Sequence, residues 1–122
     1  MGIISRLFGT APNKEAQQPE HAVLVEIPLS NNEFGLDQER SQIQELTDQM
    51  DAAINEAGVG EFDGDEFGDG ICTLYMYGPD ADRLLAVIDS ILRSDEIFRG
   101  AKVTKRYGQA SDPKAREEHI EY

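Results

Sequence analysis

ICTLYMYGPDADRLLAVIDSIL, residues 71–92, holds a strand pattern and a helix pattern in direct succession. Over residues 71–77 the side chains alternate strictly, with Cys72, Leu74 and Met76 on one face. Further along, the apolar residues recur at three- and four-residue spacing, as on one face of a helix. A strand that leads directly into a one-sided helix predicts an α+β domain in which helices cover one face of a sheet.

Two further patterns lie N-terminal to this stretch. Residues 21–29 are almost continuously apolar and rich in Val and Ile, which predicts a strand that is buried on both faces or central in a sheet. Residues 38–57 repeat apolar side chains along one face and predict a second helix. Ser41 and Gln44 have capping-box spacing at its start, and Asp37 is an alternative cap one turn earlier.

Two weaker strand signals complete the order of elements. Residues 59–62 predict a short partner strand for 71–77, joined to it by an acidic, glycine-rich loop over 63–70. Residues 101–107 alternate weakly and predict a last strand. Its basic residues are Lys102, Lys105 and Arg106. They suit the edge of a sheet, because charge there discourages further strand pairing.

The predicted order over residues 21–107 is strand, helix, strand, strand, helix, strand, which resembles the ferredoxin-like fold. The resemblance implies a four-stranded antiparallel sheet with two helices packed on one face. It implies no particular activity, because that fold hosts many unrelated functions. We expect residues 1–20 to form a short apolar turn and a flexible linker, and residues 108–122 to form a polar tail with a short helix.

The overall charge separates several classes of function. The chain has 24 Asp and Glu residues against 11 Lys and Arg, a formal net charge of -13. Direct nucleic-acid binding is disfavoured, because it relies on Lys and Arg at the phosphates. No segment approaches the roughly 20 apolar residues that span a bilayer, so we expect no stable membrane association. A single cysteine and no secretory signal predict a cytoplasmic protein.

No pattern in the sequence indicates catalysis. Phosphate-loop, hydrolase, zincin and dinucleotide motifs are all missing. Cys72 shares its strand face with Leu74, so we expect a buried thiol that only fills the core. The stretch from Asp63 partly matches a calcium loop, but Phe67 stands at position 5, and Leu74 takes the place of the bidentate Glu. We therefore expect no enzyme, no cofactor and no bound metal.

Most of the negative charge lies in one segment. Residues 31–70 contain twelve acidic residues and one basic residue, a net charge of -11. We expect the first helix and the central hairpin to form one strongly negative side, which would steer the protein toward a basic partner. Phe62 and Phe67 are predicted as apolar anchors in the loop. The complete set of predicted partner contacts is Glu45, Asp48, Asp51, Glu61, Phe62, Asp63, Asp65, Glu66, Phe67 and Asp69.

These observations lead to a hypothesis of function and its rivals. The hypothesis is a non-enzymatic binding or inhibitory protein of the immunity-protein type, which occludes a basic surface on a toxin, a nuclease or another nucleic-acid enzyme. The first alternative is a regulatory domain that senses a small molecule or a divalent metal and forms a homodimer through its sheet, where Tyr75 and Tyr77 would be exposed. A second is an enzyme with an active site shared across a dimer. Acidity that only aids solubility explains the charge without a partner.

Overall fold

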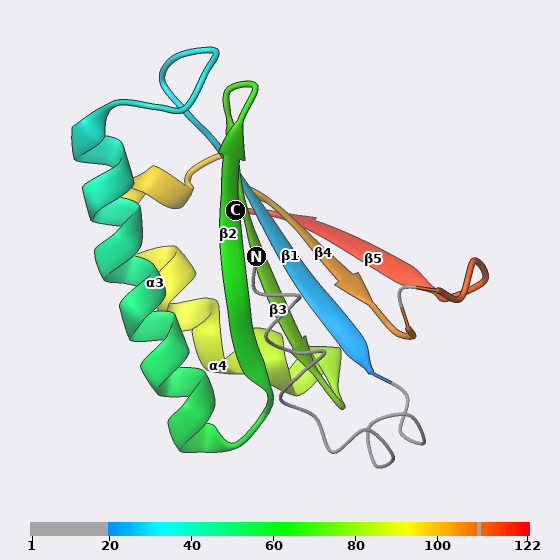
Figure 1. Ribbon diagram of the computed structural model, residues 1–122. Helices are drawn as coiled ribbons and strands as arrows, with labels where there is room; N and C mark the ends of the chain where they lie inside the picture. The colour runs from blue at the N-terminus through cyan, green and yellow to red at the C-terminus, as the bar shows by residue number, and fades with distance from the viewer. Residues whose placement is uncertain (1–19, 110) are drawn as a thin grey trace.

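The computed structural model describes residues 20–109 and 111–122, which form one antiparallel sheet with two helices against it (Figure 1). The elements in chain order are β1 (His21–Pro28), α3 (Asp37–Ala57), β2 (Glu61–Gly68), β3 (Ile71–Gly78), α4 (Ala81–Ser94), the 3-10 turn η1 (Glu96–Phe98), β4 (Lys102–Arg106) and β5 (Glu117–Glu121). The strands lie in the order β2-β3-β1-β4-β5, and every neighbouring pair is antiparallel. Residues 1–19 of the predicted apolar turn and linker lie outside the described residues. No helix in the described part of the chain has the length and apolar character needed to cross a membrane.

The prediction of an α+β protein with two helices on an antiparallel sheet is confirmed, but the predicted number of four strands is wrong. Residues 117–121, expected in a polar tail with a short helix, form the fifth strand. β4 is therefore an interior strand and not the expected edge. The register places Lys102 opposite Glu121, Lys105 opposite Glu118, and Arg106 opposite Glu117. Opposite charges that face each other across two strands stabilise the pairing, so the basic residues of β4 favour a further strand.

The core lies between the two helices and one face of the sheet. β3 contributes Cys72, Leu74 and Met76, all fully buried as the alternation predicts. β1 contributes Val23, Val25 and Ile27 in the same way. Both helices lie on this side of the sheet (Figure 1), so the residues between those positions point to the other side. We call that side the open face.

The hairpin of β2 and β3 is longer than the sequence analysis expected. Residues 63–68, predicted as a loop, belong to β2, and the turn contains only Asp69 and Gly70. The φ angles of these two residues are 53° and 80°. Positive φ at both central residues is the geometry of a tight hairpin turn that Asp-Gly favours. The turn chemistry therefore prevails over the acidic, glycine-rich composition that suggested a loop.

The start of α3 differs in detail from the predicted cap. The helix begins at Asp37, and Ser41 and Gln44 lie inside its first turns and not at a cap. Glu39 instead takes the role of the third helical residue in a capping box, because its carboxylate accepts a hydrogen bond of 2.9 Å from the N–H of Leu36. The aliphatic Leu36 offers no side-chain acceptor in return.

Candidate functional site

The predicted contact residues on α3 form an exposed acidic row. Glu45, Asp48 and Asp51 are all exposed on the side of the helix away from the core. Asp48 accepts a hydrogen bond of 3.0 Å from Gln44, and Asp51 accepts one of 3.2 Å from Asn55. Among the described residues, no Lys or Arg forms an ion pair with any of the three carboxylates. Within the part of the chain that the structure describes, their negative charge therefore has no counter-charge beside it.

β2 distributes the other predicted contacts over two faces of the sheet, because successive side chains of a strand point in opposite directions. The register places Phe62, Asp65 and Phe67 opposite Met76, Leu74 and Cys72, on the side that the helices cover. Glu61 and Glu66 pair with Tyr77 and Thr73, so they lie on the open face. Asp63 lies at a β-bulge between Phe62 and Gly64, and Asp69 lies in the turn. The predicted contacts on β2 and its turn thus share one edge of the sheet and do not form a single face.

Phe62 and Phe67, predicted as apolar anchors in the loop, lie in β2 and not in a loop. Both side chains are partly buried and pack against the hydrophobic core. The large apolar side chains that are exposed in the described residues are Phe34, Leu36 and Ile71, with exposed fractions of 58%, 53% and 40%. None of the three was among the predicted contacts. The sequence could have indicated Phe34 and Leu36, because these two apolar residues interrupt an otherwise polar loop.

Asp65 influences the pKa of Cys72 beside the core. Although the Asp65 side chain is exposed in large part, partial desolvation raises its pKa above the ordinary value. Burial, reinforced by the negative charge of Asp65, raises the pKa of the Cys72 thiol to about 12. A thiol with such a pKa stays protonated at neutral pH and does not supply a thiolate nucleophile.

The partial match to a calcium loop does not survive in the fold. Residues 63–68 are strand, so neighbouring carboxylates point to opposite faces and do not converge on one point. Within residues 20–109 and 111–122, no three His, Cys, Asp or Glu side chains form a group that could hold a metal ion.

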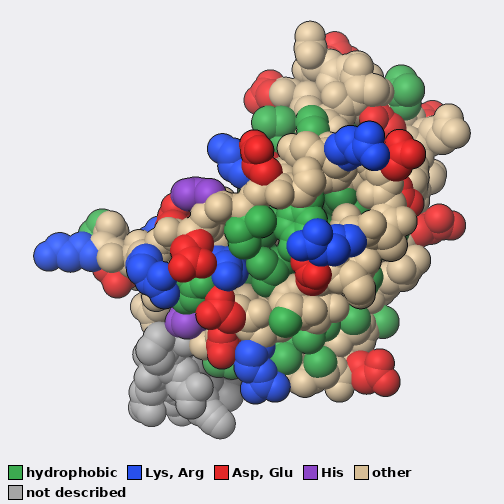
Figure 2. Space-filling model, turned by 180° about the vertical axis from the view of Figure 1, so that it is seen from behind, with side chains coloured by type: hydrophobic (Ala, Val, Ile, Leu, Met, Phe, Trp, Pro, Cys, Tyr) green, Lys and Arg blue, Asp and Glu red, His purple; other side chains and the backbone are tan. Residues whose placement is uncertain are grey.

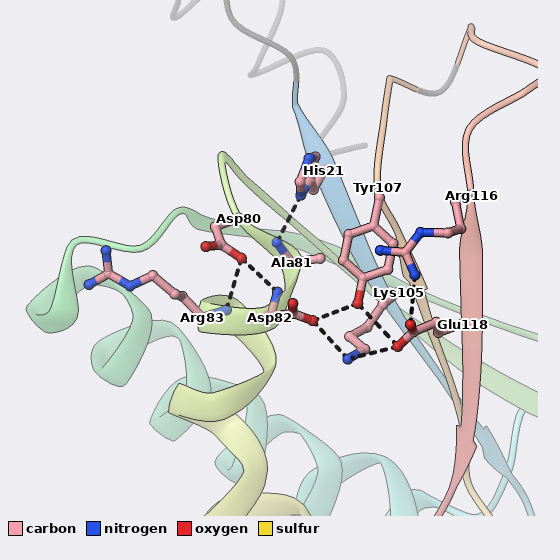
Figure 3. A network of polar contacts seen from close by, with 9 residues as sticks. All are labelled: His21, Asp80, Ala81, Asp82, Arg83, Lys105, Tyr107, Arg116 and Glu118. Atoms are coloured by element: carbon pink, nitrogen blue, oxygen red, sulfur yellow. Dashed lines mark hydrogen bonds and ion pairs between the residues drawn. The ribbon is translucent and has the colours of Figure 1, made fainter.

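A second polar cluster, which the sequence analysis missed, joins α4 to the last two strands (Figure 3). We call it the Lys105 network, which comprises Asp82, Lys105, Tyr107, Arg116 and Glu118. Lys105 Nζ lies 2.8 Å from Asp82 Oδ1 and 3.3 Å from Glu118 Oε1. The Tyr107 hydroxyl donates to Asp82 at 2.5 Å. Arg116 lies over the Tyr107 ring, with 4.1 Å from its guanidinium carbon to the ring centroid, and it pairs with Glu118 at 2.8 Å.

The Lys105 network balances its own charge. Hydrogen bonds from Lys105, then from Tyr107, lower the pKa of Asp82 and of Glu118. The same bonds raise the pKa of Lys105, whose side chain is only 13% exposed. Asp82 and Glu118 therefore remain ionised beside a charged Lys105 at neutral pH. The network fixes β5 against α4, and it was missed because β5 itself was not predicted.

The N-terminus of α4, next to this network, has two acceptors. Asp80 is the cap, as predicted, and its Oδ1 accepts hydrogen bonds from the N–H groups of Asp82 at 2.9 Å and Arg83 at 3.3 Å. His21 Nδ1 accepts from the N–H of Ala81 at 3.0 Å (Figure 3). These contacts hold the helix start against the beginning of β1.

A groove of about 390 Å³ lies at the other end of α4, beside η1 and the C-terminal residue. Its lining includes Arg93, Arg99, Glu96 and Glu121. Figure 2 shows Lys and Arg side chains next to Asp and Glu side chains around an apolar centre on the back of the molecule. Charges of both signs give this groove no preference for one class of charged ligand, in contrast to the exposed acids of α3.

Comparisons with known proteins give no match, whether with protein-family models, with curated proteins or with solved structures.

The described residues present two kinds of charged surface. One is balanced, at α4, β4 and β5. The other is acidic, along α3 and β2.

Proposed function

We propose that this protein is a non-enzymatic binding or inhibitory protein, whose acidic side occludes a basic surface on a protein partner. The acidic side is the exposed row of α3 together with the acidic residues of β2 and its turn. The observation that supports the proposal is the uneven distribution of counter-charges. Arg93, Lys105, Arg106 and Arg116 each have an acidic partner on α4 or β5, whereas Glu45, Asp48 and Asp51 have no basic partner among residues 20–109 and 111–122.

A surface charge of one sign mainly affects how fast a partner approaches and associates. The exposed carboxylates of α3 attract a positive surface over distances of about the Debye length, raise the association rate and disfavour acidic competitors. The basic surfaces that carry the most concentrated positive charge are those that bind phosphates. A toxin, a nuclease or another nucleic-acid enzyme is therefore the class of partner that fits best, and occupation of its basic surface would inhibit it.

We further infer a ferredoxin-like architecture for residues 21–107, with β5 as an addition beside β4. The strand order β2-β3-β1-β4 and the two helices on one side of the sheet support this inference. The architecture leaves the function open, because it hosts many activities. It does provide a rigid frame that holds α3 beside the edge strand β2.

The experiment is a comparison of two triple variants that lose the same charge. In the first, E45Q, D48N and D51N remove the acidic row of α3. In the control, E96Q, D112N and E121Q remove three exposed acids elsewhere. Tagged proteins are used to capture partners from the native cell at low and high salt, and the affinity of a purified partner is then measured.

We expect the unchanged protein and the control to capture a protein with a basic surface, and to lose it at high salt. The α3 variant should bind that partner at least about tenfold more weakly, since each charge pair in an interface contributes of order 1 kcal/mol. Equal affinity of the two triple variants for the partner would refute the proposal.

A further inference from the structure

The three exposed apolar side chains gather at one end of the molecule. Phe34 and Leu36 belong to the loop between β1 and α3, and Ile71 is the first residue of β3. Figure 1 shows this loop and the β2–β3 turn side by side, beyond the ends of the strands. Backbone hydrogen bonds join the two segments, from Leu29 N–H to the Gly70 carbonyl at 2.8 Å and from Gly70 N–H to the Glu33 carbonyl at 2.9 Å. We call Phe34, Leu36 and Ile71 the apolar tip.

The loop that carries the tip is fixed by its own polar side chains. The amide oxygen of Asn31 accepts hydrogen bonds from the N–H groups of Glu33 and Gly35, both at 2.9 Å. The Glu39 carboxylate accepts from the N–H of Ser30 at 3.0 Å and from its hydroxyl at 2.9 Å, in addition to the bond from Leu36. These bonds, above all the one from Leu36, lower the pKa of Glu39.

Arg40 adds a third set of contacts to the same loop. Its guanidinium donates to the carbonyl of Gly35 at 2.8 Å and to that of Phe34 at 3.3 Å, and it also pairs with Asp37. The only basic residue between positions 31 and 70 is therefore occupied within the loop. Its charge is offset by Asp37 and does not neutralise the acidic side.

Two glycines allow this arrangement. Gly35 has a φ of +82°, and a Cβ there would lie 3.1 Å from the Glu39 carboxylate. Gly70 has a φ of +80°, and a Cβ there would lie 3.1 Å from the Asn31 carbonyl. Both positions therefore favour glycine, because any other residue would be strained there. Because the loop is fixed in this way, its apolar side chains stay exposed to water. In the free protein, this exposure does not contribute to stability. Preordered apolar groups of this kind are typical of binding surfaces, because their ordering cost is incurred before the partner arrives.

The charges next to the tip indicate what it binds. Glu33 and Asp37 lie beside Phe34 and Leu36 in the chain, and Asp69 precedes Ile71 by two residues. We propose that the apolar tip inserts into an apolar pocket within the basic surface of the partner, with Phe34 as the main anchor. This proposal deepens the proposed function and rests on it, since it assumes the same basic partner. It assigns the anchor to the β1–α3 loop and not to Phe62 or Phe67.

The test uses two fluorescein-labelled synthetic peptides of equal length and equal lysine content. The spacer residues are Ser in one peptide and Leu in the other. Fluorescence anisotropy at low salt gives the affinity of each peptide for the full chain and for F34S, I71S and the control A52S, which changes an exposed residue of α3. Circular dichroism during heating verifies that each variant folds, which we expect because Phe34 and Ile71 are exposed.

We expect the unchanged protein to bind the Lys/Leu peptide about tenfold more tightly than the Lys/Ser peptide, the effect of burying one large apolar side chain. F34S should abolish this difference without changing the affinity for the Lys/Ser peptide, I71S should reduce it, and A52S should leave it intact. A difference that persists in F34S, or no difference in the unchanged protein, overturns the assignment of the tip.

The outcomes distinguish this proposal from the proposed function. Loss of Lys/Ser binding in the α3 triple variant, together with equal binding of both peptides, would support the acidic side and refute the tip. Failure of the Lys/Ser peptide to bind at low salt would count against the acidic side itself. Sedimentation velocity supplies the last arm, because a concentration-dependent dimer that F34S abolishes would assign the tip to a second copy of this chain and overturn the proposal.

Discussion

Arg106 on β4 and Glu117 on β5 lie directly opposite each other, with 2.7 Å between Nη1 and Oε2. The neighbouring pair, Lys105 and Glu118, repeats the arrangement on the other side of the sheet at 3.3 Å. β5 has few apolar contacts to add, since Ile120 is only partly buried. The last strand is thus attached to the sheet to a large extent by charge.

This attachment predicts that β5 loosens at high salt. The Debye length falls from about 10 Å at 0.1 M to about 3 Å at 1 M, so the half-exposed partners of these pairs are screened. Hydrogen exchange measured by mass spectrometry should show faster exchange of the β5 amides in 1 M NaCl, whereas β1, in the centre of the sheet, should not change. R106Q should produce the same acceleration at low salt, and the control K114Q should not. Parallel responses of β5 and β1 to salt would contradict the prediction.

The Lys105 network should make stability depend on acid. The pKa values of Asp82 and Glu118 lie below their ordinary values of 3.8 and 4.5. Their contribution to stability is therefore complete above those ordinary values and is lost as the pH falls through the lowered ones. K105M removes the main cause of both shifts. Urea unfolding should show K105M to be less stable than the unchanged protein at pH 7, with a smaller difference near pH 2.5. A constant difference across this range would show that the ion pairs do not contribute.

Ionised Asp65 should lower the stability of the folded protein at neutral pH, in contrast to Asp82 and Glu118. Desolvation raises its pKa, so the folded state disfavours the ionised carboxylate and is less stable at neutral pH than it would be with a neutral side chain. D65N should raise the free energy of unfolding by about 0.5 kcal/mol at pH 7, a small gain because solvent screens the exposed side chain. The gain should disappear near pH 2.5, where Asp65 is itself protonated. E45Q removes an equal charge from the exposed side of α3 and serves as the control, with a smaller effect expected at pH 7.

Phe62 and Phe34 should differ in how much they contribute to the stability of the folded protein. F62A should lower the free energy of unfolding by about 2 kcal/mol, because the ring packs against the core and its removal leaves a cavity. F34A, which removes a ring that is 58% exposed, should change stability by less than about 0.5 kcal/mol. Urea unfolding monitored by circular dichroism measures both values. An equal loss in the two variants would indicate that Phe34 also packs in the folded protein.

A close approach of two backbones at Gly60 should make this position intolerant of alanine. The φ of Gly60 is +151°, and a Cβ there would lie 2.2 Å from the carbonyl oxygen of Tyr77. G60A should therefore destabilise the protein by about 3 kcal/mol. Gly58, which ends α3 with a φ of +66°, has no atom within 4 Å of such a Cβ. G58A is the matched control, with an expected cost of about 1 kcal/mol. Thermal unfolding ranks the two, and an equal cost would exclude the steric explanation.

Local patterns in the sequence determined the buried faces of this protein. The alternation over residues 71–77 and the helical spacing after Asp80 each depend on neighbours within a few positions, so they predict which side of an element is buried. The acidity of residues 31–70 is also a property of the sequence. The turn at Asp69 and Gly70 was present as a signal, but the acidic residues around it favoured a loop in the sequence analysis.

Tertiary structure alone decided the rest. Residues 117–121 carry too much charge to indicate a strand, and they form one because β4 supplies bases opposite their acids. The alternation of β2 directs the acids of 61–66 to two faces, and it turns Phe62 and Phe67 toward the core. The exposure of Phe34 depends on hydrogen bonds that Asn31 and Glu39 accept and that Arg40 donates within a folded loop. The sequence shows which charged and apolar groups are present. Which of them contact one another is decided only when distant segments pack together in the fold.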